Sequence, residues 1–307
     1  MIVAYIDAYK SEFGVEPICR VLKDHDFKIA PSTYYAYRSR PAAARTLSDA
    51  RLLPIVTEAH RDNYGVYGVR KMWRALLRRG ELIGRDQVAR LMRLGRLRGA
   101  TRAKRPKRGA AVVPGFRSPD LVRRDWFRGA PDLVWVADFT HVRTREGWMY
   151  VSFLQDGFSR RILGFTVRAS MGAELVTSAL LQAVSVRRRT NPEFVGDGVI
   201  HHSDAGGQYV SLALTEKLLD LGVAGSVGRV GTAHDNALME STIGLYKTEL
   251  VNRRAIGWDS RQELETATAR WVAWFNRERL HGELGYRPPI EIEMEYLQNQ
   301  GLPRQAA

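Results

Sequence analysis

The stretch Leu133-Val134-Trp135-Val136-Ala137-Asp138-Phe139 is apolar at odd and even positions alike. A strand with one face in solvent alternates between apolar and polar residues, so this pattern predicts a strand that is buried on both faces of a sheet. A carboxylate at the end of such a strand costs several kcal/mol, roughly, unless a positive group compensates it. Asp138 is therefore the first candidate functional residue.

Two further carboxylates occur in similar settings. Asp204 closes the expected strand Gly198-Val199-Ile200-His201-His202-Ser203-Asp204 and precedes the pair Gly206-Gly207. Glu240 lies in Asp235-Asn236-Ala237-Leu238-Met239-Glu240-Ser241, where a helical stretch opens. These segments contain no matching lysine or arginine, which suggests a divalent metal. Ligation by oxygen alone favours Mg²⁺ or Mn²⁺ over zinc.

The composition sets the class of protein. The chain has 307 residues, enough for about two domains. Lysine and arginine total 47 against 33 acidic residues, a net charge of +14, which indicates a polyanionic partner and most often nucleic acid. The alternative is a basic surface that only keeps the protein in solution. With one cysteine, Cys19, an internal disulfide framework and a cysteine-based zinc site are excluded.

Nothing in the sequence predicts a membrane protein. No apolar run reaches the roughly 18 residues that a membrane-spanning helix needs. The first ten residues lack a basic leader followed by a cleavage site, so no secretion signal is expected. We expect a soluble protein of the cytoplasm with no membrane partner.

The N-terminal part is helical and increasingly basic. Apolar residues recur at helical spacing in 48–60, in 68–79 and from Arg85 onward, and Gly80 marks the end of the second helix. Three short helices with a basic last one resemble a helix-turn-helix unit that binds DNA. The alternative is a small helical bundle with solvated arginines. The basic residues expected to contact DNA are Arg85, Arg90, Arg93, Arg96, Arg98, Lys104 and Arg105.

The domain boundaries follow from these patterns. Residues 1–47 form a helical region with helices at 15–22 and 32–37, the latter with Ser32 as N-cap, and this region is either a second helix-turn-helix or a support for the first. Residues 48–100 form the helix-turn-helix-like domain. Residues 101–130, rich in proline, glycine and arginine, are interpreted as a basic linker. A catalytic core is expected over 131–290 and a C-terminal tail over 291–307.

The order of elements predicts an α/β fold for the core. Strands are expected at 133–143, 148–155 and 161–167, then a helix at 173–186, a strand at 198–203, a helix at 212–221 and a strand at 223–227. Long helices follow at 236–251 and 261–276. Three short-linked strands followed by alternating helices and strands resemble the RNase H-like fold, in which two acids lie on adjacent strands and a third comes from a helix.

Several motifs together resemble a known family. His202-Ser203-Asp204-x-Gly-Gly-Gln-Tyr and Asp235-Asn236-Ala-x-x-Glu240-Ser, with the aspartate of the first strand, are similar to the DDE transposases and retroviral-type integrases. Tyr64-Gly65-x-x-Gly68-x-Arg70 upstream and Phe275-Asn276-x-x-Arg279-x-His281 near the end extend the resemblance over almost the whole chain. Within that group the chain looks like the second-reading-frame (OrfB) transposase of bacterial insertion sequences.

The resemblance implies roles for individual residues. Asp138, Asp204 and Glu240 are expected to be catalytic and to bind two Mg²⁺ (or Mn²⁺) ions per active site, with Asp138 bridging them. Asn236 and Lys247 share a helical face with Glu240, and we expect them to contact DNA. His202 is as well explained by packing as by a role at the site, Asp156 by a turn, and Trp271 and Trp274 by a core.

The implied function is a DNA transposase that cleaves insertion-sequence ends and transfers the strands into target DNA, for DNA integration and recombination. The expected partners are terminal repeats, target DNA, further copies of the chain in a multimer, and a first-frame (OrfA) protein or a fusion with it. The expected location is the bacterial cytoplasm, at the nucleoid when bound. The alternatives are a metal-dependent nuclease of the same fold and a non-catalytic, DNA-binding regulator derived from a transposase.

Overall fold

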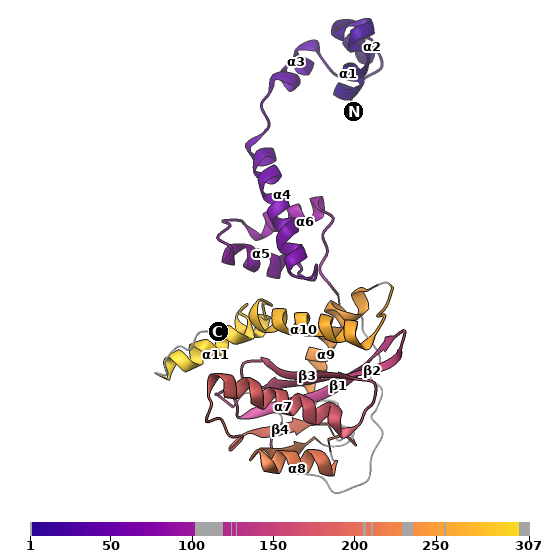
Figure 1. Cartoon of the computed structure of the whole chain (residues 1–307). Helices are drawn as coiled ribbons and strands as arrows, with labels where there is room; N and C mark the ends of the chain where they lie inside the picture. The colour runs from indigo at the N-terminus through magenta and orange to yellow at the C-terminus, as the bar shows by residue number, and fades with distance from the viewer. Residues whose placement is uncertain are drawn as a thin grey trace. The chain divides into compact units, whose positions relative to one another are not determined.

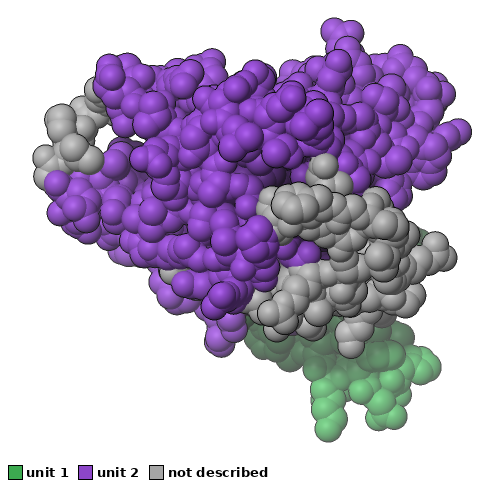
Figure 2. Space-filling view, turned by 90° about the horizontal axis from the view of Figure 1, so that it is seen from below, with its two compact units in different colours: residues 1–55 green, residues 56–307 purple. Residues whose placement is uncertain are grey.

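A computed structural model describes residues 2–101, 119–123, 125–126, 128–204, 207–209, 211–228, 236–254 and 256–300. The chain divides into two compact units, residues 1–55 and 56–307, which are coloured separately in Figure 2. The division falls within one helix, α4 (Ala44–Asp62).

The first unit is built from three short helices, α1 (Ile2–Phe13), α2 (Val15–Asp24) and α3 (Pro31–Ser39), and from the first part of α4. Ile6, Ile18, Cys19 and Tyr34 form its small core. The prediction of Ser32 as N-cap of the third helix is wrong, because Ala30 holds that position and Pro31 is the first helical residue. The fixed φ of proline is already helical, so Pro31 can start the helix where its missing N–H is no loss.

The second unit opens with the end of α4, followed by α5 (Val69–Arg78) and α6 (Arg85–Leu94). The apolar residues that set the predicted periodicity are buried, among them Met72 and Leu76 on α5 and Val88 and Leu91 on α6. Gly80 has a φ of +82° and ends α5, as predicted, because a left-handed residue there lets the chain turn back. The sequence pattern therefore located the helices of this basic region.

In the described residues the strands of the second unit form one five-stranded sheet in the order β3-β2-β1-β4-β5. β1 (Val134–Thr144), β2 (Gly147–Asp156) and β3 (Ile162–Arg168) pair in antiparallel fashion, whereas β4 (Ile200–Ser203) and β5 (Ala224–Val227) run parallel to β1. Residues 134–137 are buried, which confirms that β1 is covered on both faces. The element order is that of the predicted RNase H-like fold.

Helices cover the sheet on both faces. α7 (Ala173–Thr190) lies across one face, as Figure 1 shows, and Gly164 of β3 allows the close approach, since a Cβ there would stand 2.0 Å from the carbonyl oxygen of Ala179. α9 (Ala237–Glu249) and α10 (Arg261–Arg277) pack on the other face, where the Phe153 ring meets Tyr246 and Trp271. The late tryptophans Trp271 and Trp274 are buried, which confirms their role in the core. The remaining elements are α8 (Leu212–Asp220) and the 3-10 helices η1 (Val251–Arg253) and η2 (Gly282–Leu284).

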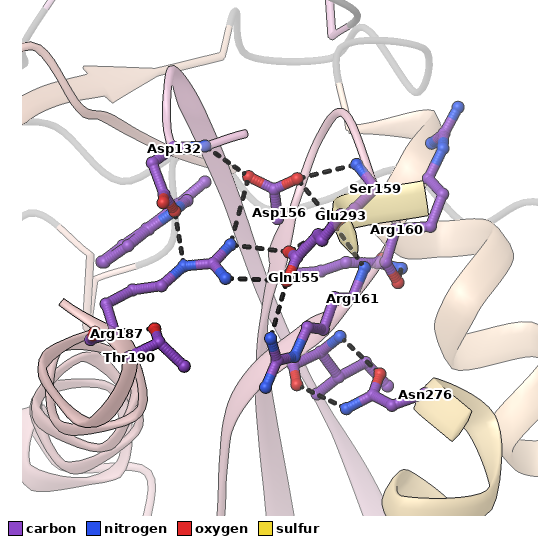
Figure 3. A network of polar contacts seen from close by, with 12 residues as sticks. Asp132, Gln155, Asp156, Ser159, Arg160, Arg161, Arg187, Thr190, Asn276 and Glu293 are labelled. Atoms are coloured by element: carbon purple, nitrogen blue, oxygen red, sulfur yellow. Dashed lines mark hydrogen bonds and ion pairs between the residues drawn. The ribbon is translucent and has the colours of Figure 1, made fainter. Parts of the chain in front are cut away.

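The segment expected as a C-terminal tail begins within a helix, α11 (Pro289–Asn299). Its Glu293 is buried and accepts two hydrogen bonds from Arg187 at 2.8 and 2.9 Å and one from Arg161 at 2.6 Å (Figure 3). Arg187 also bonds Asp132 at 2.7 Å and lies 3.8 Å from Asp156. The positive charges of Arg187 and Arg161 outweigh the effect of burial and lower the pKa of Glu293 to about 2. This network fastens α11 to α7 and to the end of the sheet.

We expect Glu293→Gln to lower the free energy of unfolding by about 3 kcal/mol, because the change keeps the shape but leaves Arg187 buried with less compensating charge. Urea denaturation followed by circular dichroism and tryptophan fluorescence measures the loss. Glu295→Gln on the same helix is the matched control, since Glu295 is exposed and its loss changes stability by under about 0.5 kcal/mol. Equal stabilities of the two variants would contradict a structural role for the network.

Candidate active site

Two of the predicted acids lie on neighbouring strands. β1 and β4 are paired up to Ala137 and Ser203, and Asp138 and Asp204 are the next residue on each strand. Asp138 faces Phe153 across the β1–β2 pair, and the Phe153 ring contacts Tyr246 of α9. Because cross-strand partners share a face of the sheet, Asp138 lies on the α9 side. The predicted placement of these two acids on adjacent strands is confirmed.

The third acid comes from α9, which two side chains tie to the sheet. Asn236, at the start of the helix, donates a hydrogen bond from Nδ2 to the carbonyl oxygen of Ala137 at 3.0 Å, and its own carbonyl accepts the N–H of Glu240 at 3.0 Å. One turn later Thr242 Oγ1 donates to Gln155 Oε1 of β2 at 2.7 Å. These bonds fix the first turn of α9, and with it Glu240, next to Asp138.

Asp204 and Glu240 are close enough to Asp138 to affect its pKa. Burial, followed by the negative charges of Asp204 and Glu240, raises the pKa of Asp138 to about 7. The N–H of Phe139, which donates to Asp138 Oδ1 at 2.7 Å, and the ammonium of Lys247 act in the opposite direction but do not cancel the rise. The site therefore has an excess of negative charge that a cation would relieve.

The donor set fits a divalent cation in chemistry and charge. All three candidate ligands are carboxylates, which Mg²⁺ and Mn²⁺ prefer, and no histidine or cysteine needs to take part. The buried Asn236 Oδ1 beside them accepts no hydrogen bond from the described residues. Over the described ranges, no group of three or more His, Cys, Asp and Glu side chains is gathered closely enough to hold a metal ion. Asp204 and Glu240 thus affect the pKa of Asp138, but the three carboxylates are not gathered around one metal position in the described structure.

Lys247 and Asn236 differ in their exposure. Lys247 is half-buried on α9, and its charge lowers the pKa of Asp138 and also that of His141, for which burial is the larger cause. Asn236 is only 1% exposed, with its amide directed at β1. It anchors the helix, and its expected contact with DNA stays a prediction.

The hydrogen bond between Thr242 and Gln155 was not predicted from the sequence. The only local signal for it is a glutamine in an otherwise apolar strand.

His202 is packed within the fold. Its ring is fully buried, its Nδ1 lies 2.9 Å from Ser226 Oγ, and Trp126 meets the ring edge-on at 5.1 Å. Leu121 donates its N–H to the same Ser226 hydroxyl at 2.9 Å. The described end of the expected linker, 119–123, therefore packs on β5. Asp156 is the last residue of β2 and not a residue of the turn as predicted, but it accepts the N–H of Ser159 at 2.7 Å and so stabilises the turn that follows.

The arginines expected to bind DNA lie at the surface of the helical region. Arg85, Arg93, Arg96 and Arg98 are exposed and Arg90 is half-buried. Arg85 lies 3.2 Å from the exposed Asp86, a pair that solvent screens strongly. Lys104 and Arg105 lie outside the described residues. No described helix is long and apolar enough to cross a membrane.

Comparison with known proteins places these features in a family. Residues 47–105 match the model of an HTH-like domain, and residues 128–233 and 221–289 match models of an integrase core domain. The transposase for insertion sequence element IS629 of Shigella sonnei is 41% identical over 304 residues, which cover 96% of this chain and 97% of that protein. A Mycobacterium tuberculosis protein for insertion sequence element IS986/IS6110 is 43% identical over 275 residues, 90% of this chain and 98% of that one.

Among solved structures, the HTLV-2 integrase catalytic core domain in complex with magnesium is similar at 18% identity, with a TM-score of 0.42, over 54% of this chain and 98% of that chain. The relatives match almost end to end, and the helix-turn-helix and core regions match in the order that the fold displays. This chain therefore belongs to the transposases of insertion sequences, which join an HTH-like domain to an integrase core of RNase H-like fold.

Proposed function

We propose that this chain cuts the ends of an insertion sequence and joins the freed 3′-hydroxyls to target DNA, with Mg²⁺ or Mn²⁺ as cofactor, two ions per active site. The observation that carries the proposal is the position of Asp138 and Asp204 directly after the paired residues Ala137 and Ser203 of neighbouring strands, in a chain of the transposase family. Burial and the charges of Asp204 and Glu240 raise the pKa of Asp138, which supports it. Ionised carboxylates that repel one another are stabilised when a positive partner binds between them.

The roles of the side chains follow from their positions. The charges of Asp204 and Glu240 both raise the pKa of Asp138, so Asp138 is the residue proposed to contact both ions. Asp204 and Glu240 would each complete the site of one ion. Divalent cations held there would supply Lewis-acid stabilisation of the attacking and leaving oxygens of a phosphodiester. Asn236, Gln155 and Thr242 would keep Glu240 in place. Lys247 would contact a phosphate of the DNA end beside the acids.

The other partners belong to the same proposal. The exposed arginines of α6 and the segment after it would bind phosphates or base edges of the terminal repeats. Two ends have to be held at once for joining, which favours a multimer of this chain on DNA. Two alternative functions are a nuclease that cuts DNA without joining it and a regulator that binds DNA without cutting it. The products of the reaction distinguish both from a transposase.

Glu240→Gln keeps the shape of the side chain and removes its charge, so we expect it to lower strand transfer by about 100-fold or more while DNA binding persists. The assay uses labelled element-end DNA with Mg²⁺ or Mn²⁺ and measures joined products. Glu216→Gln on α8 is the control and leaves joining unchanged. Nicks without joining in the wild type would favour the nuclease. Binding without any metal-dependent cleavage, unaffected by Glu240→Gln, would refute the proposed site.

The raised pKa of Asp138 predicts a pH dependence of stability. Between the ordinary pKa of an aspartate, 3.8, and about 7 the folded protein binds more protons than the unfolded chain, so stability falls as pH rises through this window. We expect Asp138→Asn to flatten that slope and to be more stable than the wild type at pH 8 by about 1–2 kcal/mol. Thermal unfolding without metal at pH 5 to 8 measures this.

The exposed Asp220→Asn serves as control for Asp138→Asn. Mg²⁺ should stabilise the wild type more at pH 8 than at pH 6, and stabilise Asp138→Asn little at either pH, since binding to the folded state alone raises the free energy of unfolding. Parallel pH curves for the wild type and Asp138→Asn would show that the acids do not interact as proposed.

The partner proposed from the first reading frame leads to a separate prediction. We expect this chain alone to bind element ends weakly or with little preference over unrelated DNA, and a fusion with the first-frame protein to recover end specificity. Fluorescence anisotropy with end and scrambled duplexes at one salt concentration compares the two proteins. Equal end specificity of the chain and the fusion would contradict the need for that partner.

A further inference from the structure

A pocket of about 520 Å³ lies beside α9 and is lined by basic side chains. Lys71 reaches it from α5, Arg160 from the turn between β2 and β3, and Arg279 and His281 from the segment after α10. These four residues define what is called here the basic pocket. Ser241 and Thr242 form part of its wall, whereas Glu240 does not line it, so the basic pocket is distinct from the three acids.

The charges around the basic pocket do not balance. Glu283 is the one carboxylate among its described lining residues, and that side chain is 83% exposed at 3.6 Å from Arg160. Arg279 is already neutralised by Glu249, which accepts its Nε at 2.9 Å and its Nη2 at 2.5 Å. Figure 3 shows the Arg160 side chain directed away from Glu293, which Arg161 contacts instead. Positive charge is therefore left over on this side of α9.

Lys71 carries most of that excess. It is half-buried, its Nζ lies 5.4 Å from the centre of the Tyr67 ring, and no salt bridge joins it to a carboxylate of the described residues. Burial, with a smaller effect from the positive charge of Arg279, lowers the pKa of Lys71 to about 8, although the charge of Glu249 acts in the opposite direction. A desolvated lysine beside an arginine is stabilised in its charged form when an anion binds there.

His281 lies at the same place. Its ring is 9% exposed, and its Nδ1 lies 3.4 Å from Nη1 of Arg279. Burial, followed by the charges of Arg279 and Lys71, lowers the pKa of His281 well below its usual value, although a hydrogen bond with the backbone of Phe275 acts in the opposite direction. The imidazole is therefore neutral, and the positive charge of the basic pocket comes from its lysine and arginines.

We propose that the basic pocket binds a phosphate group through Lys71 and Arg160, and that this phosphate belongs to the backbone of bound DNA. The inference rests on the proposed function for the choice of DNA as the source. Trp126, which also lines the pocket, favours that choice because an aromatic ring beside a phosphate site can stack on a base. A free nucleotide or inorganic phosphate would satisfy the same charges.

The test is DNA binding by the full chain as a function of salt. Lys71→Met keeps the aliphatic stem and removes the charge. We expect it to weaken DNA binding roughly five- to tenfold and to reduce, by about one, the slope of log affinity against log salt concentration. Lys217→Met on α8 is the control, since Lys217 lies at the surface beside Asp220. It removes the same charge and should leave both the affinity and its salt dependence unchanged. Lys71→Arg should restore most of the affinity. If Lys71→Met left both the DNA affinity and its salt dependence unchanged, the proposal that the basic pocket binds a phosphate would be wrong.

A second measurement identifies the source of the phosphate. Amine acetylation at pH 8, read by peptide mass spectrometry, reports whether Lys71 is covered, and Lys217 is the internal reference. Protection by duplex DNA but not by inorganic phosphate or a deoxynucleoside monophosphate supports the DNA backbone. Protection by the small anions alone would refute DNA as the source, and protection by neither would refute the site. A wild type that binds no DNA at all would instead contradict the proposed function.

Discussion

The central position of β1 is the constraint on which the rest of the second unit depends. β1 pairs with β2 on one side and β4 on the other, and helices cover both of its faces. The first part of β1, residues 134–137, is buried, so a charged carboxylate beside it is costly unless its surroundings compensate the charge. Asp138 follows that part, and burial with the charges of Asp204 and Glu240 raises its pKa more than Lys247 lowers it. That arrangement favours the binding of a cation.

Two carboxylates illustrate the difference between structural and candidate functional charge in this fold. Glu293 is surrounded by Arg187 and Arg161, and its pKa falls to about 2. At Asp138, desolvation and the charges of two nearby acids raise the pKa to about 7. The first group has its compensation inside the protein and holds α11 against α7. The second lacks it, which is costly for stability and typical of a catalytic position.

Helix α9 connects the features of the active region. Its start is fixed by the hydrogen bond from Asn236 to β1, its second turn by the bond from Thr242 to β2, and its core face by Tyr246 against Phe153. Glu240 is thereby held near Asp138, while Ser241 and Thr242 belong to the wall of the basic pocket. A phosphate bound in that pocket would contact the same helix that carries the third acid. Movement of α9 would therefore affect both.

The sequence by itself determined most elements of the second unit, because burial on two faces and helical periodicity are local patterns, seen at Trp135, Val136, Val88 and Leu91. It did not locate α1 or α11, in which few apolar residues are buried. The tertiary structure alone decided which distant side chains meet: Arg187 with Glu293, Asn236 with the backbone of Ala137, Lys71 with His281. Polar contacts of this kind depend on how helices dock on the sheet, and a local sequence pattern contains no signal for the partner. Charge balance at a site is therefore a property of the packed fold.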